Sequence, residues 1–273
     1  MSSFLSVGRS ETEPMRLEFY KSLWGWEHRP VAEACQDALD RGYDGIETPI
    51  GTLLEARAAG YSGRAISLLF PGNVDELSDG LRDSAEAKVE KVTVHAAKDW
   101  WSNDRGSSFF EQALPLIEDS GLEVNFETHR GRLLFSPAST HYFLTEFPAL
   151  HICADFSHWT AVSESMLQDQ DDSLSLAILR TRHLHARVGH EEGPQVPDPR
   201  APMWAGHTAR FLEIWDRVFE ASEQRGAEVL TVDPEFGPPH YLWTDPVGGL
   251  PLADQHEICD WMMESLRSRW AER

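Results

Sequence analysis

The sequence predicts an α/β fold, a single (β/α)8 TIM barrel spanning residues 15–273. Runs with apolar side chains at alternate positions recur at intervals of roughly 30 residues, and a stretch with helical periodicity follows each run. No composition break or low-complexity segment marks a linker, so the 273 residues fit one barrel. A doubly wound open sheet is the alternative, but no glycine fingerprint follows the first strand.

The individual elements follow from these patterns. Strands are predicted at Leu17–Tyr20, Tyr43–Thr48, Arg64–Phe70, Lys91–His95, Val124–Glu127, Leu150–Asp155, His183–Val188 and Val229–Asp233. Helices are predicted at Val31–Leu39, Leu53–Ala59, Val74–Lys88, Phe109–Asp119 with a kink at Pro115, Ser139–Glu146, Asp171–Leu179, Ala209–Gln224 and Asp254–Trp270. A loop rich in glycine and proline covers Gly189–Gly206, and the polar residues Met1–Pro14 are expected to form a flexible N-terminal segment.

Composition restricts the partners and the compartment. The formal net charge of -21 argues against a nucleic-acid partner, because such a protein repels phosphate, and it suits a site that gathers divalent cations. The widely spaced Cys35, Cys153 and Cys259 indicate a reducing compartment and no disulfide framework. The first 14 residues lack the apolar core of a signal peptide, and no run is long enough to span a membrane. A cytoplasmic enzyme without a membrane partner is therefore expected.

Polar, chemically capable side chains stand at the predicted strand ends, which is where TIM barrels carry their active sites. In the fifth strand Val124 and Phe126 share one side, while Asn125 and Glu127 share the other. If the apolar side packs against helices, Glu127 points into the barrel and needs a partner there. Read in chain order, the strand-end groups are Glu47, His95, Glu127, Asp155, His185 and Glu235.

Four of these groups form the sharpest hypothesis, since Glu127, Asp155, His185 and Glu235 come from four consecutive strands. Three carboxylates with one imidazole suit a divalent cation such as Mn²⁺, Mg²⁺, Co²⁺ or Zn²⁺. Without a cation the converging carboxylates would repel one another. His183 shares the parity of His185 but lies deeper, where a hydrogen-bonded core histidine is expected.

The motifs NFETHRG, ADFSHW, HLHARVG and DPEFGPP, together with GYDGIE at Gly42–Glu47, resemble those of the xylose-isomerase-like TIM barrels, the sugar-phosphate isomerase/epimerase superfamily. The resemblance covers nearly the whole chain. It implies one divalent metal ion, most often Mn²⁺, held by Glu127, Asp155, His185 and Glu235. It also implies that Glu127 and Glu235 are the acid/base pair.

The same resemblance points to His158, three residues after Asp155, and to Arg187 as substrate-binding groups. His95 and Glu47, at the ends of two other predicted strands, are expected either to contact substrate or to have structural roles. The implied activity is isomerisation or epimerisation of a sugar or related polyhydroxy carbonyl compound. One glutamate removes a proton beside the carbonyl, a metal-stabilised enediolate forms, and the proton returns at the same or the neighbouring carbon.

Several alternatives stay open. A lyase or C-glycoside-cleaving subunit would use the same metal site, and a small partner subunit or a homo-oligomer would be compatible with either enzyme. An endonuclease IV-like repair enzyme is disfavoured by the acidity, and a metal-free binding subunit is the remaining class. An aryl or apolar substrate part is suggested by the tryptophans expected on the active-site face, taken together, namely Trp100, Trp101, Trp159, Trp204 and Trp243. For any single one of them, packing in the core or in a lid is the expected role. His129, Arg130 and Arg132 are expected either to bind polar groups or to be solvated.

Overall fold

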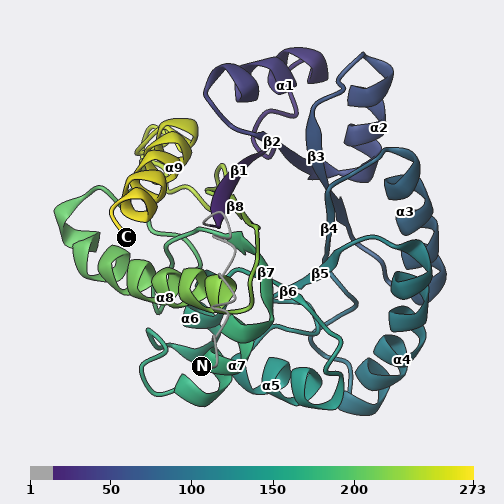
Figure 1. Ribbon diagram of the computed structural model, residues 1–273. Coiled ribbons are helices and arrows are strands. Elements are labelled where there is room, and N and C mark those ends of the chain that lie inside the picture. Colours follow the sequence, from purple (N-terminus) through teal and green to yellow (C-terminus); the bar gives the residue numbers. More distant parts are fainter. Residues whose placement is uncertain (1–14) are drawn as a thin grey trace, which may run out of the picture.

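The computed structural model describes residues 15–273, which form a closed barrel of eight parallel strands, ordered as in the chain and surrounded by helices (Figure 1). Each strand pairs with its neighbours in sequence, and β1 pairs with β8 to close the barrel. The predicted single-domain TIM barrel is therefore confirmed, and the open doubly wound sheet is excluded. The predicted flexible segment Met1–Pro14 lies outside the described residues.

The strands are β1 Arg16–Ser22, β2 Gly45–Pro49, β3 Arg64–Leu69, β4 Lys91–Val94, β5 Val124–Glu127, β6 Ile152–Ala154, β7 Thr181–His185 and β8 Val229–Asp233. The helices are α1 Val31–Asp40, α2 Ile50–Ala58, α3 Val74–Glu86, α4 Asn103–Ser120, α5 Pro137–Glu146, α6 Ser157–Ser163, α7 Asp171–Arg180, α8 Ala205–Gln224 and α9 Gln255–Ala271. A short 3₁₀ helix, η1 Pro202–Trp204, precedes α8.

Two predicted elements have other bounds in the structure, and one helix was not predicted. Helix α4 begins at Asn103, ahead of the predicted Phe109, because the Ser102 side chain accepts a hydrogen bond from the Arg105 amide and caps the helix. Strand β7 ends at His185, so the predicted continuation to Val188 belongs to the following loop. Helix α6, directly after β6, was not predicted, since its seven residues are too few to show an amphipathic period.

The two faces of the strands divide as the alternation predicts. Outside the barrel, Phe126 of β5 packs edge-on against Phe110 of α4, with ring centroids 5.1 Å apart. Inside it, the Glu47 carboxylate of β2 accepts a hydrogen bond from the Thr93 hydroxyl of β4 at 2.6 Å and lies 2.8 Å from His183 Nε2 of β7. Strands β2, β4 and β7 are not neighbours, so these side chains meet across the barrel interior. The interior is therefore a polar, hydrogen-bonded layer beneath the strand ends.

Two global expectations concern the surface and the cysteines. Between residues 15 and 273, none of the helices combines the length and the apolar character that crossing a membrane requires. Cys35, Cys153 and Cys259 are buried as free thiols, as expected from their wide spacing in the sequence.

Candidate metal and active site

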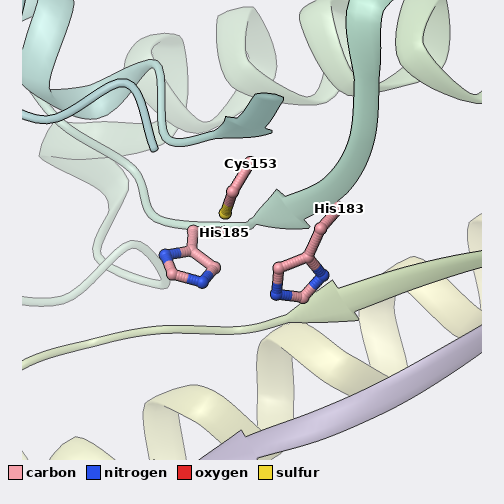
Figure 2. A group of neighbouring side chains, drawn as sticks. All are labelled: Cys153, His183 and His185. Carbon is pink, nitrogen blue, oxygen red and sulfur yellow. The ribbon is translucent and has the colours of Figure 1, made fainter. Parts of the chain in front are cut away.

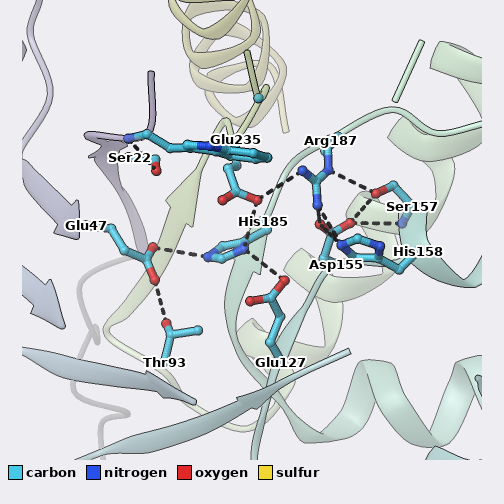
Figure 3. Close-up of polar contacts among 12 residues, drawn as sticks. Ser22, Glu47, Thr93, Glu127, Asp155, Ser157, His158, His185, Arg187 and Glu235 are labelled. Carbon is cyan, nitrogen blue, oxygen red and sulfur yellow. Dashed lines mark hydrogen bonds and ion pairs between the residues drawn. The ribbon is translucent and has the colours of Figure 1, made fainter. Parts of the chain in front are cut away.

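The four predicted metal ligands converge at the carboxyl ends of β5–β8. Glu127 ends β5, Asp155 follows β6, His185 ends β7 and Glu235 follows β8. One donor atom from each lies within 4.8 Å of the donor atoms of the other three (Figure 3). All four side chains are largely withdrawn from solvent, with Glu235 the most exposed at 12%. The structure thus brings together four side chains whose first and last members, at 127 and 235, are 108 positions apart in the chain.

His185 is oriented by a carboxylate beneath it. Its Nε2 lies 3.1 Å from Glu47 Oε2, which can only accept, so Nε2 carries the hydrogen and donates. The opposite nitrogen, Nδ1, is buried without a hydrogen-bond partner. It lies 3.4 Å from Glu235 Oε2 and 3.7 Å from Glu127 Oε1. A proton or a metal cation on Nδ1 would satisfy these oxygens, so the donor set fits a cation.

Asp155 is held by a local turn and by a buried arginine. Its Oδ1 accepts hydrogen bonds from the Ser157 amide, at 3.0 Å, and from the Ser157 hydroxyl. Its Oδ2 is paired with Arg187 Nη2, and Arg187 Nη1 lies 3.4 Å from Glu235 Oε2. Arg187 therefore bridges two of the predicted ligands and fixes their spacing. Burial outweighs the opposing effect of the Arg187 guanidinium and raises the pKa of Asp155 to about 6.

The electrostatics of this group show an excess of buried negative charge. Burial raises the pKa of Glu235, but Arg187 and His185 outweigh that effect and hold it below its usual value. Burial lowers the pKa of His185, but the neighbouring Cys153 and then the surrounding carboxylates outweigh this effect and raise the pKa well above its usual value. Below them Asp233 is fully buried, and both of its carboxylate oxygens lack a hydrogen-bond partner. A divalent cation would offset this charge directly.

The residues predicted to contact substrate occupy different positions. His95 and Arg187 line the cavity above the ligands, whereas Glu47 and His158 lie outside its lining. The two Glu47 oxygens are engaged by Thr93, His183 and His185, which places this carboxylate under the site. His158 is buried and accepts a hydrogen bond from Arg187 Nη2 at 2.8 Å. Burial, then the neighbouring His129 and Arg187, lower the pKa of His158 well below its usual value.

A neighbouring cluster of possible metal ligands consists of Cys153, His183 and His185 (Figure 2). Both ring nitrogens of His183 already have partners, because Nδ1 lies 3.0 Å from the Thr231 carbonyl oxygen and Nε2 lies 2.8 Å from Glu47 Oε2. The placement agrees with the expected core histidine. Cys153 is fully buried on the interior side of β6, and burial raises the pKa of its thiol well above the usual value.

The cavity at this end of the barrel has a volume of about 650 Å³. Glu127 and Glu235 belong to its lining, whereas Asp155 and His185 do not. The two glutamates are therefore the predicted ligands that face the cavity. Tyr241, in the loop after β8, also lines the cavity. Most of the apolar lining comes from the chain between β1 and the residue after β3, namely Leu23, Trp24, Trp26, Pro30, Val31, Ala34, Pro49, Leu68 and Phe70.

The tryptophans that line this cavity are not the five that the sequence suggested as stacking partners for a substrate. Trp24 and Trp26 line it, and the five tryptophans named from the sequence do not. Trp159 is buried in the core and donates its Nε1 hydrogen to the Leu134 carbonyl at 3.1 Å, because α6 turns it away from the strand ends. Trp100 is 70% exposed to solvent. The alternation of apolar residues after β1 did not distinguish a cavity wall from ordinary core packing.

The wall around Trp24 depends on loops that are distant in the chain. The indole packs directly over Gly237, where a Cβ atom would collide with the ring. Gly237 is itself held by the buried Gln195 side chain, which accepts from its amide at 2.7 Å and donates to its carbonyl at 3.1 Å. Gln195 belongs to the long loop after β7 and was not singled out from the sequence. It ties that loop to the segment that carries Glu235.

Comparison with solved structures places the fold. The probable 3-DHS dehydratase AsbF of Bacillus anthracis superposes with a TM-score of 0.61 at 14% sequence identity, covering 91% of this chain and 98% of that one. A sugar phosphate isomerase/epimerase of Parabacteroides distasonis gives a TM-score of 0.58 at 11% identity, covering 95% and 98%.

A D-psicose 3-epimerase crystallised with D-fructose gives 0.55 at 12% identity, covering 92% of this chain and 97% of that one. This chain has the fold of the sugar-phosphate isomerase/epimerase barrels. The xylose-isomerase-like barrel that its motifs predicted is therefore confirmed as a fold. No protein-family model and no curated protein sequence matches the chain. At such low identities the likeness shows the fold alone and does not establish the reaction.

Proposed function

We propose that the chain is a divalent-metal-dependent isomerase or epimerase of a sugar or related polyhydroxy carbonyl compound. The observation that carries the proposal is the geometry of the four convergent donors. Their ligand atoms lie within 4.8 Å of one another, and the two glutamates among them face the cavity. A group that can bind a cation thus also presents two carboxylates to a bound substrate.

The proposed ligands are Glu127, Asp155, His185 through Nδ1, and Glu235. A set rich in carboxylate oxygens with one imidazole favours Mn²⁺, with Mg²⁺, Co²⁺ and Zn²⁺ as further possibilities. When bound, the cation would polarise a substrate carbonyl and acidify the adjacent C–H bond. Glu47 would act by holding the Nε2 hydrogen of His185, so that Nδ1 points at the site.

Glu127 and Glu235 are the proposed acid/base pair. One carboxylate removes the proton from the carbon next to the carbonyl, and the other, protonated, gives a proton back. Return on the opposite face of the same carbon produces an epimer, and return at the neighbouring carbon produces an aldose–ketose isomer. Arg187 and His95 line the same cavity and are the proposed contacts for substrate oxygens. His158 supports Arg187 through the hydrogen bond to Nη2 and is proposed to act on the substrate through it.

The proposed substrate carries an apolar or aryl part. A cavity of about 650 Å³ is in the range of small-molecule sites that enclose ligands larger than a simple sugar. Its wall on the β1–β3 side includes Trp24, Trp26 and Phe70, which offer ring faces and edges to an apolar group. The polar head would lie at the glutamates, and the apolar part would lie against this wall.

The test combines metal content with proton exchange. Wild type, Glu235→Gln and Glu192→Gln are purified without an affinity tag and analysed for bound metal after incubation with Mn²⁺. Glu192 is exposed in the loop after β7 and serves as the matched control. About one ion per chain is expected in the wild type and the control, and less in Glu235→Gln.

The same proteins are then incubated in D₂O with ketoses, both unsubstituted and carrying an aryl group. With the wild type and with Glu192→Gln, deuterium is expected at the carbon beside the carbonyl of the substrate. With Glu235→Gln, no deuterium is expected there. If the wild type binds no metal after incubation with Mn²⁺, Co²⁺ and Zn²⁺, the proposed function is wrong.

A lyase is the second candidate, and the aromatic wall of the cavity favours it. Removal of the same proton followed by departure of a hydroxyl from the next carbon forms a C=C bond and releases water. An apolar substrate part would fit the wall formed by Trp24 and Trp26. Product formation with new ultraviolet absorbance, together with one water lost per turnover by mass, would identify the lyase. Interconversion of two compounds of equal mass would identify the isomerase or epimerase.

A further inference from the structure

A second group of metal-ligand side chains faces the same cavity. His95, Glu127 and His129 each offer a donor atom, and these atoms lie within 4.8 Å of one another. All three residues belong to the cavity lining. His95 follows β4, and His129 follows Glu127 after the end of β5, so the group lies beside the four-ligand site and shares one residue with it.

The two carboxylate oxygens of Glu127 face different partners. Oε1 lies 3.7 Å from His185 Nδ1, within the four-ligand group. Oε2 is in close contact with His95 Nε2, outside that group. A carboxylate with one oxygen toward each of two imidazoles has the arrangement of a bridging ligand between neighbouring cations.

One ring nitrogen of His129 is held by the backbone, which leaves the other as its ligand atom. Its Nδ1 contacts the carbonyl oxygen of Arg130, which can only accept, so Nδ1 carries the hydrogen. The neutral ring therefore has its lone pair on Nε2, which is the tautomer that metal-bound histidines adopt when a carbonyl fixes the other nitrogen. The His129 ring lies against the His95 ring, with ring centroids 4.6 Å apart, so the two imidazoles are direct neighbours.

We propose that His95, Glu127 and His129 bind a second divalent cation, with Glu127 bridging the two ions. Two imidazoles and one carboxylate favour Zn²⁺ or Co²⁺, whereas the carboxylate-rich first site favours Mn²⁺. Three protein ligands leave coordination positions for water or substrate. All three ligands line the cavity that a substrate would enter. The inference rests on the proposed function at one point, the use of Glu127 Oε1 by the first ion.

The experiment counts ions in each site separately. Metal-free protein is titrated with Zn²⁺ by calorimetry, and bound zinc is measured by elemental analysis after gel filtration. The variants are His95→Gln and His129→Gln for the second site and Asp155→Asn for the first. His141→Gln, on α5 and outside the cavity lining, is the matched control. Far-ultraviolet circular dichroism checks that each variant is folded.

Two zinc ions per chain are expected in the wild type and in His141→Gln, and one in each of the other three folded variants. Co²⁺ added in place of Zn²⁺ should give a visible absorption band that weakens in His95→Gln and His129→Gln. A single ion lost in Asp155→Asn and retained in both histidine variants overturns the second site and leaves the proposed function standing. A single ion lost only in the histidine variants supports this site and overturns the four-ligand site. No bound ion in the wild type overturns both.

Discussion

The two halves of the barrel contribute different properties to the site. Strands β5–β8 end in Glu127, Asp155, His185 and, after β8, Glu235, and they carry the charge. The chain from β1 to Phe70, the residue after β3, contributes Trp24, Trp26, Phe70 itself and most of the apolar cavity wall. The proposed chemistry and the fit of the substrate are therefore encoded in separate stretches of sequence. Substitutions on each side should change different measured constants.

Glu47 crosses this division and makes the comparison more informative. It belongs to β2, yet its carboxylate is bonded to His183 and His185 of β7. The first half of the chain therefore has two roles. Glu47 orients a predicted metal ligand of the charged half, and other residues of the first half form the apolar wall of the cavity. Substitutions in the charged half are expected to have larger effects than substitutions in the apolar half.

Replacement of Glu127 by Gln should have the largest effect. The amide keeps the shape of the side chain but cannot accept a substrate proton, so kcat should fall by at least about 10³-fold, at the upper end of the usual acid/base contribution. Steady-state kinetics on a substrate of the wild type gives the value, and thermal unfolding checks the fold. Activity within about tenfold of the wild type would contradict an acid/base role of that size.

Replacement of Glu47 by Gln should lower the affinity for the first cation by about 10–100-fold, as is usual when a residue that orients a ligand is lost. The neutral amide weakens the hold on the Nε2 hydrogen of His185. Mn²⁺ titration followed by electron paramagnetic resonance measures free and bound ion. Thr93→Val is the matched control, because it removes only the hydrogen bond from the Thr93 hydroxyl to Glu47 and should lower the affinity less. Equal affinities in the wild type and Glu47→Gln would show that this carboxylate does not orient His185.

Replacement of Trp24 by Ala should affect the apolar half alone. Loss of an aromatic contact of about 0.5–1.5 kcal/mol raises KM by roughly 2- to 10-fold for a substrate with an apolar part. Metal content should stay as in the wild type. Trp100→Ala, at an exposed position outside the cavity lining, should leave KM unchanged. A loss of bound metal in Trp24→Ala would show that the two halves are not separable in this way.

The smallest effect concerns acid stability at the base of the apolar wall. His256 packs on Trp26, with ring centroids 4.6 Å apart, and burial lowers its pKa to about 3, helped by the charge of Lys21. Its pKa in the unfolded chain is about 6.5, so below that pH the unfolded state binds a proton that the folded state does not. From this residue alone, stability should fall as pH decreases from about 6.5, by at most about 1.4 kcal/mol per pH unit.

Urea unfolding at neutral and acidic pH measures this slope. In His256→Gln the stability should fall less steeply with decreasing pH than in the wild type. Parallel curves for the two proteins would show that His256 has the same pKa in the folded and unfolded states.

Much of the fold could be predicted because its signals are local. Alternation in β5 placed Phe126 outside and Glu127 inside, and a periodic stretch indicated each longer helix. Errors fell where local signals are short or ambiguous. The seven residues of α6 are too few for a clear period, and the serine that caps α4 precedes the first strongly amphipathic residues. Trp159 and Trp24 both follow strands, and nothing in their neighbours tells a core indole from one that lines a cavity.

The sequence by itself determined which side chains reach the carboxyl ends of β5–β8, because strand parity and strand order decide this in a parallel barrel. Only the tertiary structure decided how those side chains are paired. The contact of Glu47 with His185, 138 residues later, and the packing of Trp24 on Gly237 depend on barrel closure. Closure brings β1 beside β8 and turns β2 toward β7, and the register and radius of the closed barrel then fix which atoms meet. Such distances arise from the packing of the whole chain and have no signature in any single stretch.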